Sequence, residues 1–177
     1  MSAEREGIVE LRARGASVQV QHVLALVVRL KQICNFDPAT GASSKLDDLR
    51  ERVGVLAAEG YKALVFTQFA NAENGARAIA TRLGSTALAY TGDLAPHQRD
   101  QVLHQFRTHP ERRVLVLSLL AGGQGLNLQE ASYVFHFDRW WNPSVEQQAE
   151  ARSHRLGQPY PVTVYTYTCE NTIEERI

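Results

Sequence analysis

Short runs of mostly apolar residues alternate with longer amphipathic segments through most of the chain. The runs are rich in valine, leucine and aromatic residues, which is typical of strands buried on both faces of a sheet. They lie at 63–66, 86–90, 114–117 and 133–137, and a segment of alternating polarity lies at 162–167. Helices are expected at 71–83, 96–107, 143–154 and from Ile173 onward. This order predicts βαβ units in a parallel sheet that helices cover on both faces.

The first part of the chain lacks this rhythm. Residues 3–33 show no strand alternation and are expected to be helical, with an apolar stripe toward the end of the segment. The stretch 35–41 contains Asn, Asp, Pro and Gly, so it is expected to end that helix. Ser43 or Ser44 is a suitable N-cap for a second helix over 45–58. We therefore expect one α/β domain with an appended N-terminal helix.

Composition excludes several classes of protein. The chain has 177 residues, its 19 Lys+Arg balance 19 Asp+Glu, and 44% of its residues are hydrophobic. A freestanding nucleic-acid binder is usually basic, so any contact with nucleic acid is expected to be local. No apolar run approaches the roughly 18 residues of a membrane span, so no membrane association is expected. Cys34 and Cys169 have neither zinc-site nor disulfide-framework spacing, so we expect reduced thiols and no metal site.

Ligands of open parallel sheets gather at the carboxyl ends of the strands. One segment that follows a predicted strand is glycine-rich and contains Gly122, Gly123 and Gly125. Its backbone amides can cradle a phosphate, and a tight turn in a crowded crossover explains the glycines equally well. No lysine follows these glycines as in a Walker A loop, and the dinucleotide-binding fingerprint is absent too.

A pair of arginines lies near the end of a predicted helix. Arg152 and Arg155 are three residues apart, and Gln148 lies one turn before Arg152. Guanidinium groups are planar and always charged, and their donors suit phosphate. Two convergent arginines can stabilise the charge that develops on a transferred phosphoryl group. The alternative is a pair of solvated surface arginines that form ion pairs with Glu146 and Glu150.

In this order, these pieces resemble the second, C-terminal RecA-like lobe of the Swi/Snf-type ATPases, DNA-translocating members of helicase superfamily two. The most specific likeness is Trp-Asn-Pro, then Gln-Ala, then Arg-x-His-Arg-Leu-Gly-Gln, within 141–158. The loop 121–128 resembles the family's Ala-Gly-Gly-x-Gly-Leu-Asn-Leu, and 66–69 its Phe-Thr-Gln-Phe element. Leu-Lys-Gln-Ile-Cys-Asn at 30–35 and Thr-Ile-Glu-Glu-Arg-Ile at 172–177 resemble the segments that lead into and out of the lobe.

The resemblance implies a three-layer αβα, RecA-like fold without its own Walker A loop. Residues 1–40 would be an N-terminal helix and interlobe segment, and residues 41–177 the lobe itself. ATP and Mg²⁺ would be held mainly by a first lobe absent from this chain, with Arg152 and Arg155 as catalytic arginine fingers. ATP contacts are expected from Gln148, Gly123, Gly125, Arg152 and Arg155. Contacts with the backbone of double-stranded DNA are expected from Gln68, Gly92, Ser118, Gly122, Asn127, Trp141 and Asn142.

The expected activity is DNA-dependent ATP hydrolysis and translocation by a two-lobe protein, so the isolated lobe is expected to be inactive. A DNA-bound protein complex is a further expected partner. The expected location is the cytoplasm, associated with the nucleoid, in a prokaryote, or the nucleus in a eukaryote. Ala151 and Leu120 depart from the family pattern and favour an alternative, a degenerate lobe that serves as a non-catalytic docking module. The glycine loop alone also allows a self-sufficient phosphate-ligand enzyme, such as a nucleotide-sugar transferase.

Overall fold

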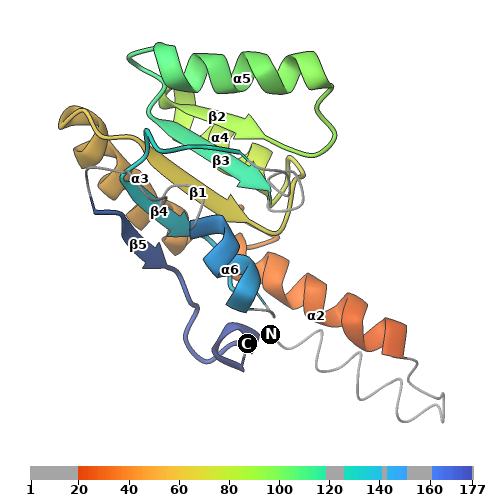
Figure 1. The fold of residues 1–177 in the computed structure, drawn as a ribbon. Helices are drawn as coiled ribbons and strands as arrows, with labels where there is room; N and C mark the ends of the chain where they lie inside the picture. The colour runs from red at the N-terminus through yellow and green to blue at the C-terminus, as the bar shows by residue number, and fades with distance from the viewer. Residues whose placement is uncertain (1–19, 119–125, 141–142, 151–160, 177) are drawn as a thin grey trace, which may run out of the picture.

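The computed structural model describes residues 20–118, 126–140, 143–150 and 161–176 (Figure 1). Its centre is a parallel sheet of five strands in the order β2-β3-β1-β4-β5. The strands are β1 (Ala63–Thr67), β2 (Ala87–Tyr90), β3 (Val114–Ser118), β4 (Tyr133–His136) and β5 (Thr163–Thr166). At its middle, Leu64 of β1 lies between Leu115 of β3 and Val134 of β4. The parallel sheet predicted from the apolar runs is confirmed.

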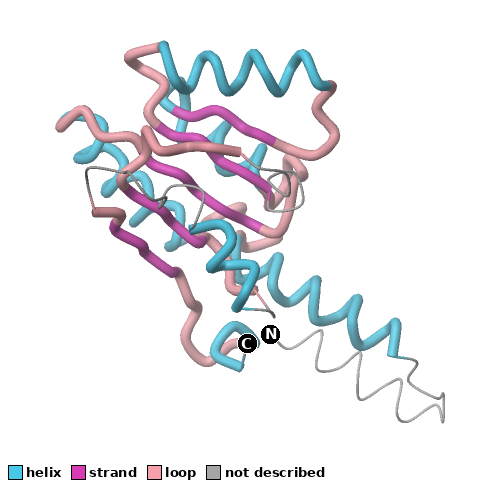
Figure 2. Tube along the Cα trace, viewed as in Figure 1, coloured by secondary structure: helices cyan, strands magenta, loops and turns pink. Residues whose placement is uncertain are grey.

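Helices cover both faces of this sheet (Figure 1 and Figure 2). The described helices are α2 (Val20–Asn35), α3 (Ser44–Ala58), α4 (Ala76–Leu83), α5 (Pro96–Thr108) and α6 (Pro143–Glu150), with 3-10 turns η1 (Gly84–Thr86) and η3 (Ile173–Arg176). α3 and α4 pack on one face around Val65 and Val116. α5 and α6 pack on the other face, around Leu64 and Leu115. Consecutive side chains of a strand point to opposite faces, so each strand supplies both apolar layers. The predicted three-layer arrangement is confirmed.

α3 shows how local sequence sets a helix that faces the core. Ser43 Oγ accepts a hydrogen bond from the backbone N of Leu46 at 3.1 Å, so Ser43, rather than Ser44, is the N-cap. Leu46, Leu49 and Val53 recur at helical spacing and are buried against the sheet. The predicted helix over this segment is confirmed.

α4 begins later than predicted. Helix was expected over 71–83, but α4 starts at Ala76. The Oδ1 atom of Asn71 accepts hydrogen bonds from the backbone N of Glu73 (3.2 Å) and of Asn74 (2.9 Å). This side-chain turn competes with a helical start, which is why the predicted boundary is wrong.

The turn before α4 passes very close to the segment after β1. A Cβ atom at Gly75 would lie 2.6 Å from the backbone of Phe69, a distance that real contacts do not show. The Phe69 carbonyl accepts a hydrogen bond from the backbone N of Ala76 at 2.8 Å. Gly75 is therefore required by this close approach of two backbone segments.

The two ends of the described chain differ from the prediction in detail. The helix expected from Ile173 is the single 3-10 turn η3. β5 lies at the sheet edge, and three of its four residues are exposed, unlike strands buried on both faces. Of the helix expected over 3–33, the described part is α2, and 151–154 of the helix expected over 143–154 lies outside the described residues. Within the described ranges, we find no helix with the length and apolar content of a membrane span.

Candidate functional site at the carboxyl edge of the sheet

The carboxyl ends of β1 and β4 lie side by side, and the chain leaves them toward opposite faces of the sheet. β1 leads to α4 in one apolar layer, and β4 leads to α6 in the other. Parallel α/β sheets commonly bind ligands where neighbouring connections diverge in this way. Here mostly buried polar side chains occupy that place, and we name them the edge network. Its members are Lys31, Asn35, Thr67, Gln68 and Asp138.

Asp138 is the centre of the edge network, and only 1% of its surface is exposed. Its Oδ1 accepts hydrogen bonds from the backbone N (3.0 Å) and from Nε2 (3.1 Å) of Gln68. Its Oδ2 accepts hydrogen bonds from Asn35 Nδ2 (2.9 Å) and from Thr67 Oγ1. A buried carboxylate is costly unless donors surround it, as they do here. Asp138 therefore joins the ends of β1 and β4 to the end of α2.

Gln68 and Lys31 hold the segment that follows Asp138. Gln68 Nε2 donates to Asp138 Oδ1 and also to the carbonyl of Arg139 at 2.5 Å. Both side-chain amide protons of Gln68 thus form hydrogen bonds within the protein, and in this conformation none is available to donate to a phosphate. Lys31 Nζ donates to the same Arg139 carbonyl, and burial lowers the pKa of Lys31. The contact of Gln68 with DNA stays a prediction.

The first turn of α6 holds the same segment from the other side. Glu146 Oε1 accepts hydrogen bonds from the backbone N of Trp140 (3.0 Å) and from Arg139 Nε (3.2 Å). A carboxylate in the first turn also suits the positive end of the helix dipole. Residues 139 and 140 after β4 are therefore held by charged side chains from both sides, Lys31 and Glu146.

His136, the last residue of β4, contacts the end of α6. Its Nε2 lies 3.3 Å from Glu150 Oε1, and its ring is fully buried. Burial lowers the pKa of His136, so the imidazole is neutral near pH 7, and Nε2–H is the tautomer that donates to Glu150. The two acids of α6 that sequence reasoning offered as partners for Arg152 and Arg155 thus contact Arg139 and His136.

The loop after β2 is held by two arginines of the neighbouring helices. Arg99 of α5 donates to the carbonyls of Gly92 and of Leu94, the latter at 2.9 Å. Arg77 of α4 donates to Asp93 Oδ2, and this guanidinium lowers the pKa of the Asp93 carboxyl to about 2. Gly92, a predicted DNA contact, therefore lies in a loop of defined shape at the carboxyl edge.

Ser118 and Asn127 lie in different surroundings. Ser118 ends β3 opposite Thr67, and 2% of its surface is exposed. Asn127 is exposed, and its carbonyl accepts a hydrogen bond at 2.9 Å from Arg107 in the last turn of α5. The same arginine pairs with Glu130 at 3.0 Å. The structure thus brings Ser118 to the edge network and ties Asn127 to α5.

Several predicted site residues lie outside the described residues. They are Gly122, Gly123, Gly125, Trp141, Asn142, Arg152 and Arg155, together with the two departures Leu120 and Ala151. The backbone of Gln148 lies within α6. The roles assigned to these residues stay predictions.

A buried ion pair lies beside the edge network and was not anticipated from the sequence. Lys45 Nζ lies 2.8 Å and 2.7 Å from the two carboxylate oxygens of Glu174, and 3.0 Å from the Phe137 carbonyl. Lys45 is 5% exposed and Glu174 is 1% exposed. The partners are 129 positions apart, so no local pattern signals the pair. For Asp138 a signal existed, since it directly follows a predicted strand.

Comparison with known proteins places this geometry in a family. Residues 44–157 match the model of the helicase conserved C-terminal domain. The chain is 38% identical over 167 residues to the putative ATP-dependent helicase/translocase YwqA of Bacillus subtilis, covering 88% of this chain and 18% of that protein. It is 45% identical over 117 residues to the DNA repair protein RAD5 of Cryptococcus neoformans, covering 66% of this chain and 10% of that protein.

Solved structures agree on the fold. The Sulfolobus solfataricus SWI2/SNF2 ATPase core in complex with dsDNA aligns with a TM-score of 0.76 at 30% identity, covering 98% of this chain and 38% of that one. The C-terminal domain of the Sulfolobus solfataricus SWI2/SNF2 ATPase aligns with a TM-score of 0.73 at 28% identity, covering 98% and 74%. The chain thus spans a small part of the curated relatives it matches. It belongs to the helicase conserved C-terminal domain family, and its fold is that of the RecA-like C-terminal lobe of SWI2/SNF2 ATPases.

Proposed function

We propose that this chain acts as the second motor lobe of an ATP-dependent double-stranded-DNA translocase. The observation that carries the proposal is a helicase C-terminal lobe whose Arg-x-His-Arg sequence directly follows α6. α6 begins at the carboxyl edge of β4, the edge at which such sheets bind ligands, and Arg152 and Arg155 come shortly after α6 in the sequence. The chain contains no Gly-x-x-x-x-Gly-Lys-Ser/Thr sequence, so a first lobe would supply the phosphate-binding lysine.

In this proposal Arg152 and Arg155 complete the ATP site, with Gln148, Gly123 and Gly125 beside them. Their guanidinium groups would stabilise the charge that develops on the γ-phosphoryl group during transfer. Asp138, the buried carboxylate at the edge, is a poor Mg²⁺ ligand because donors already occupy both of its oxygens. Because the hydrogen-bonding capacity of Asp138 is already taken up, the proposal assigns the metal ion to the first lobe.

DNA contact in this proposal is made to phosphates rather than to bases. Backbone amides and hydroxyl groups can bind phosphate without a basic excess, which agrees with the zero net charge of the chain. The similar Sulfolobus core, whose structure is a complex with dsDNA, supports this choice of ligand. Gln68 would take part by exchanging its bond to the Arg139 carbonyl for a bond to a phosphate oxygen. Gly92 would contribute from the loop that Arg99 holds.

The first test measures ATP hydrolysis by this chain alone, with and without double-stranded DNA. We expect no turnover above the background of the buffer, because the chain has no Walker A lysine. DNA-stimulated hydrolysis by the isolated chain would contradict the two-lobe assignment. It would favour a phosphate-ligand enzyme that is complete in one lobe.

The second test uses a polypeptide that carries both lobes. Arg155→Ala is expected to lower DNA-stimulated turnover on the order of a thousandfold while ATP binding stays largely intact. Arg50→Ala is the matched control, because Arg50 is an exposed arginine of α3 that pairs with Asp47. Wild-type turnover after replacement of both Arg152 and Arg155 would instead support the non-catalytic docking module.

A further inference from the structure

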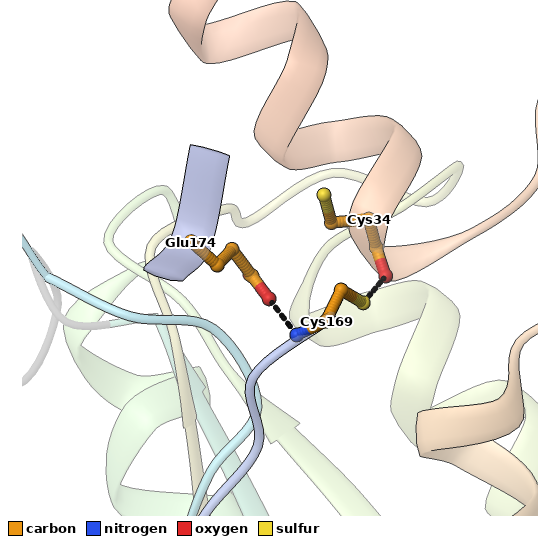
Figure 3. Close-up of side chains that lie close together, drawn as sticks. All are labelled: Cys34, Cys169 and Glu174. Carbon is orange, nitrogen blue, oxygen red and sulfur yellow. Dashed lines mark hydrogen bonds between the residues drawn. The ribbon is translucent and has the colours of Figure 1, made fainter. Parts of the chain in front are cut away.

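The thiols of Cys34 and Cys169 lie close together where α2 ends and the segment after β5 turns into η3 (Figure 3). The two cysteines are 135 positions apart, and Cys169 Sγ donates to the Cys34 carbonyl at 3.3 Å. Both sulfur atoms and a Glu174 carboxylate oxygen lie within 4.8 Å of one another. A disulfide needs a sulfur separation of about 2.05 Å, which side-chain rotation can approach from such a starting distance.

A metal ion is the less suitable occupant of this cluster. The Glu174 carboxylate already accepts hydrogen bonds from Lys45 Nζ through both oxygens, at 2.8 Å and 2.7 Å. It also accepts one from the backbone N of Cys169 at 2.9 Å. A cation bound by Glu174 would face the Lys45 ammonium at short range and would have to displace it. The cluster is thus a pair of thiols beside a carboxylate that is already engaged.

The two thiols have different acidities. The interaction with the Cys169 side chain, and a weaker one with the Thr172 side chain, lowers the pKa of Cys34 to about 7. The same interaction and burial raise the pKa of Cys169. Both side chains are partly exposed, so a small oxidant can reach them. Low thiol pKa, access and an adjacent second cysteine are the features of oxidation-sensitive thiol pairs.

We propose that Cys34 and Cys169 are an oxidation site at which hydrogen peroxide converts the two thiols into a disulfide. The Cys34 thiolate attacks one peroxide oxygen, the O–O bond breaks, and the departing hydroxide takes a proton to become water. Cys34 is then a sulfenic acid. The Cys169 sulfur attacks the Cys34 sulfur, the S–O bond breaks, and the second water leaves with the Cys169 proton. Two thiols are oxidised by two electrons, and one peroxide is reduced to two waters.

The disulfide would join two parts of the chain that organise the carboxyl edge. Cys34 immediately precedes Asn35, which donates to Asp138 in the edge network. Cys169 donates its backbone N to Glu174, the partner of Lys45. Oxidation would therefore fix the end of α2 to the segment between β5 and η3. This site is independent of the proposed ATP chemistry.

The test treats the purified chain with one equivalent of hydrogen peroxide and follows free thiols, with dithiothreitol-reduced protein as the reference. We expect loss of both thiols, a mass lower by two hydrogens, and a non-reduced proteolytic fragment in which the two cysteines are linked. Dithiothreitol should restore both thiols. The reaction rate is expected to rise with pH through the region near 7 as Cys34 ionises.

Single variants separate the two roles. In Cys169→Ser, Cys34 should still react but proceed to sulfenic and sulfinic acid without a cross-link. In Cys34→Ser, reaction with peroxide should slow at least tenfold. Circular dichroism of each reduced variant checks that it folds. Wild-type protein that keeps two thiols, or that forms only links between molecules, would overturn the proposal. Protection of both thiols by added Zn²⁺ at equimolar concentration would overturn it too, in favour of a metal site.

Discussion

The edge network predicts a graded loss of stability when its central carboxylate is changed. Asp138→Asn keeps the shape and the two hydrogen bonds at Oδ1 but places an amide NH₂ against Asn35 Nδ2 and Thr67 Oγ1. The Thr67 hydroxyl can turn and accept, whereas the Asn35 amide cannot turn without giving up its contact with Lys45 Nζ at 3.4 Å. Since hydrogen bonds to charged groups contribute about 1.5–3 kcal/mol, we expect Asp138→Asn to cost about 2 kcal/mol.

Asp138→Ala removes all four hydrogen bonds and leaves buried donors unpaired. Loss of one member of a buried charged set typically costs about 3–5 kcal/mol, so we expect about 4 kcal/mol here. Urea unfolding followed by circular dichroism gives the free energy of unfolding by linear extrapolation. Asp100→Asn, on the exposed side of α5, is the matched control and should change it by less than about 0.5 kcal/mol. Equal losses for Asn and Ala at position 138, or losses below 1 kcal/mol, would refute this account of the network.

Three further predictions concern other parts of the fold. Lys45→Met and Glu174→Leu are each expected to destabilise the protein by about 3–5 kcal/mol. The double variant is expected to lose less than the sum of these two losses. Additive losses in urea unfolding would disprove the coupling between the two side chains. The fold lowers the pKa of His136, so as the pH falls the unfolded chain takes up a proton before the folded chain does. Stability should therefore fall as the pH drops below about 6.5, and it should fall less in His136→Gln. Unfolding midpoints measured at several pH values would reveal this difference. Gly75→Ala should be destabilising, since its Cβ would meet the Phe69 backbone. Gly54→Ala, with open space around it in α3, should instead stabilise the protein by up to about 1 kcal/mol. Equal melting temperatures for the two variants would count against this description of the packing.

The sheet and its layers could be predicted because each strand carries its own signal. The runs at 63–66 and 114–117 are apolar throughout, because helices cover both faces of the sheet at these strands and bury every residue. The start of α4 at Ala76, rather than at Asn71, could not be predicted in this way, because the side-chain turn at Asn71 satisfies the local backbone as well as a helix would. Local periodicity thus fixes the existence of elements better than their ends.

The candidate site was predictable only in part. Motif order indicated the family and the edge of the sheet, and the match over 44–157 agrees with it. The contacts of Asp138, Lys45 and Cys34 depend on partners up to 135 positions away, which become neighbours only through the topology. Local sequence patterns span only a few residues, so they contain no information about such distant pairs.

The edge network has a consequence for how a nucleotide can approach this lobe. In many doubly wound proteins the space between diverging strand connections is a crevice that encloses a ligand. Here the side chains of Lys31, Asn35 and Asp138 occupy the corresponding place between the ends of β1 and β4. In the proposed two-lobe arrangement, a nucleotide would therefore lie outside these side chains rather than between the ends of β1 and β4.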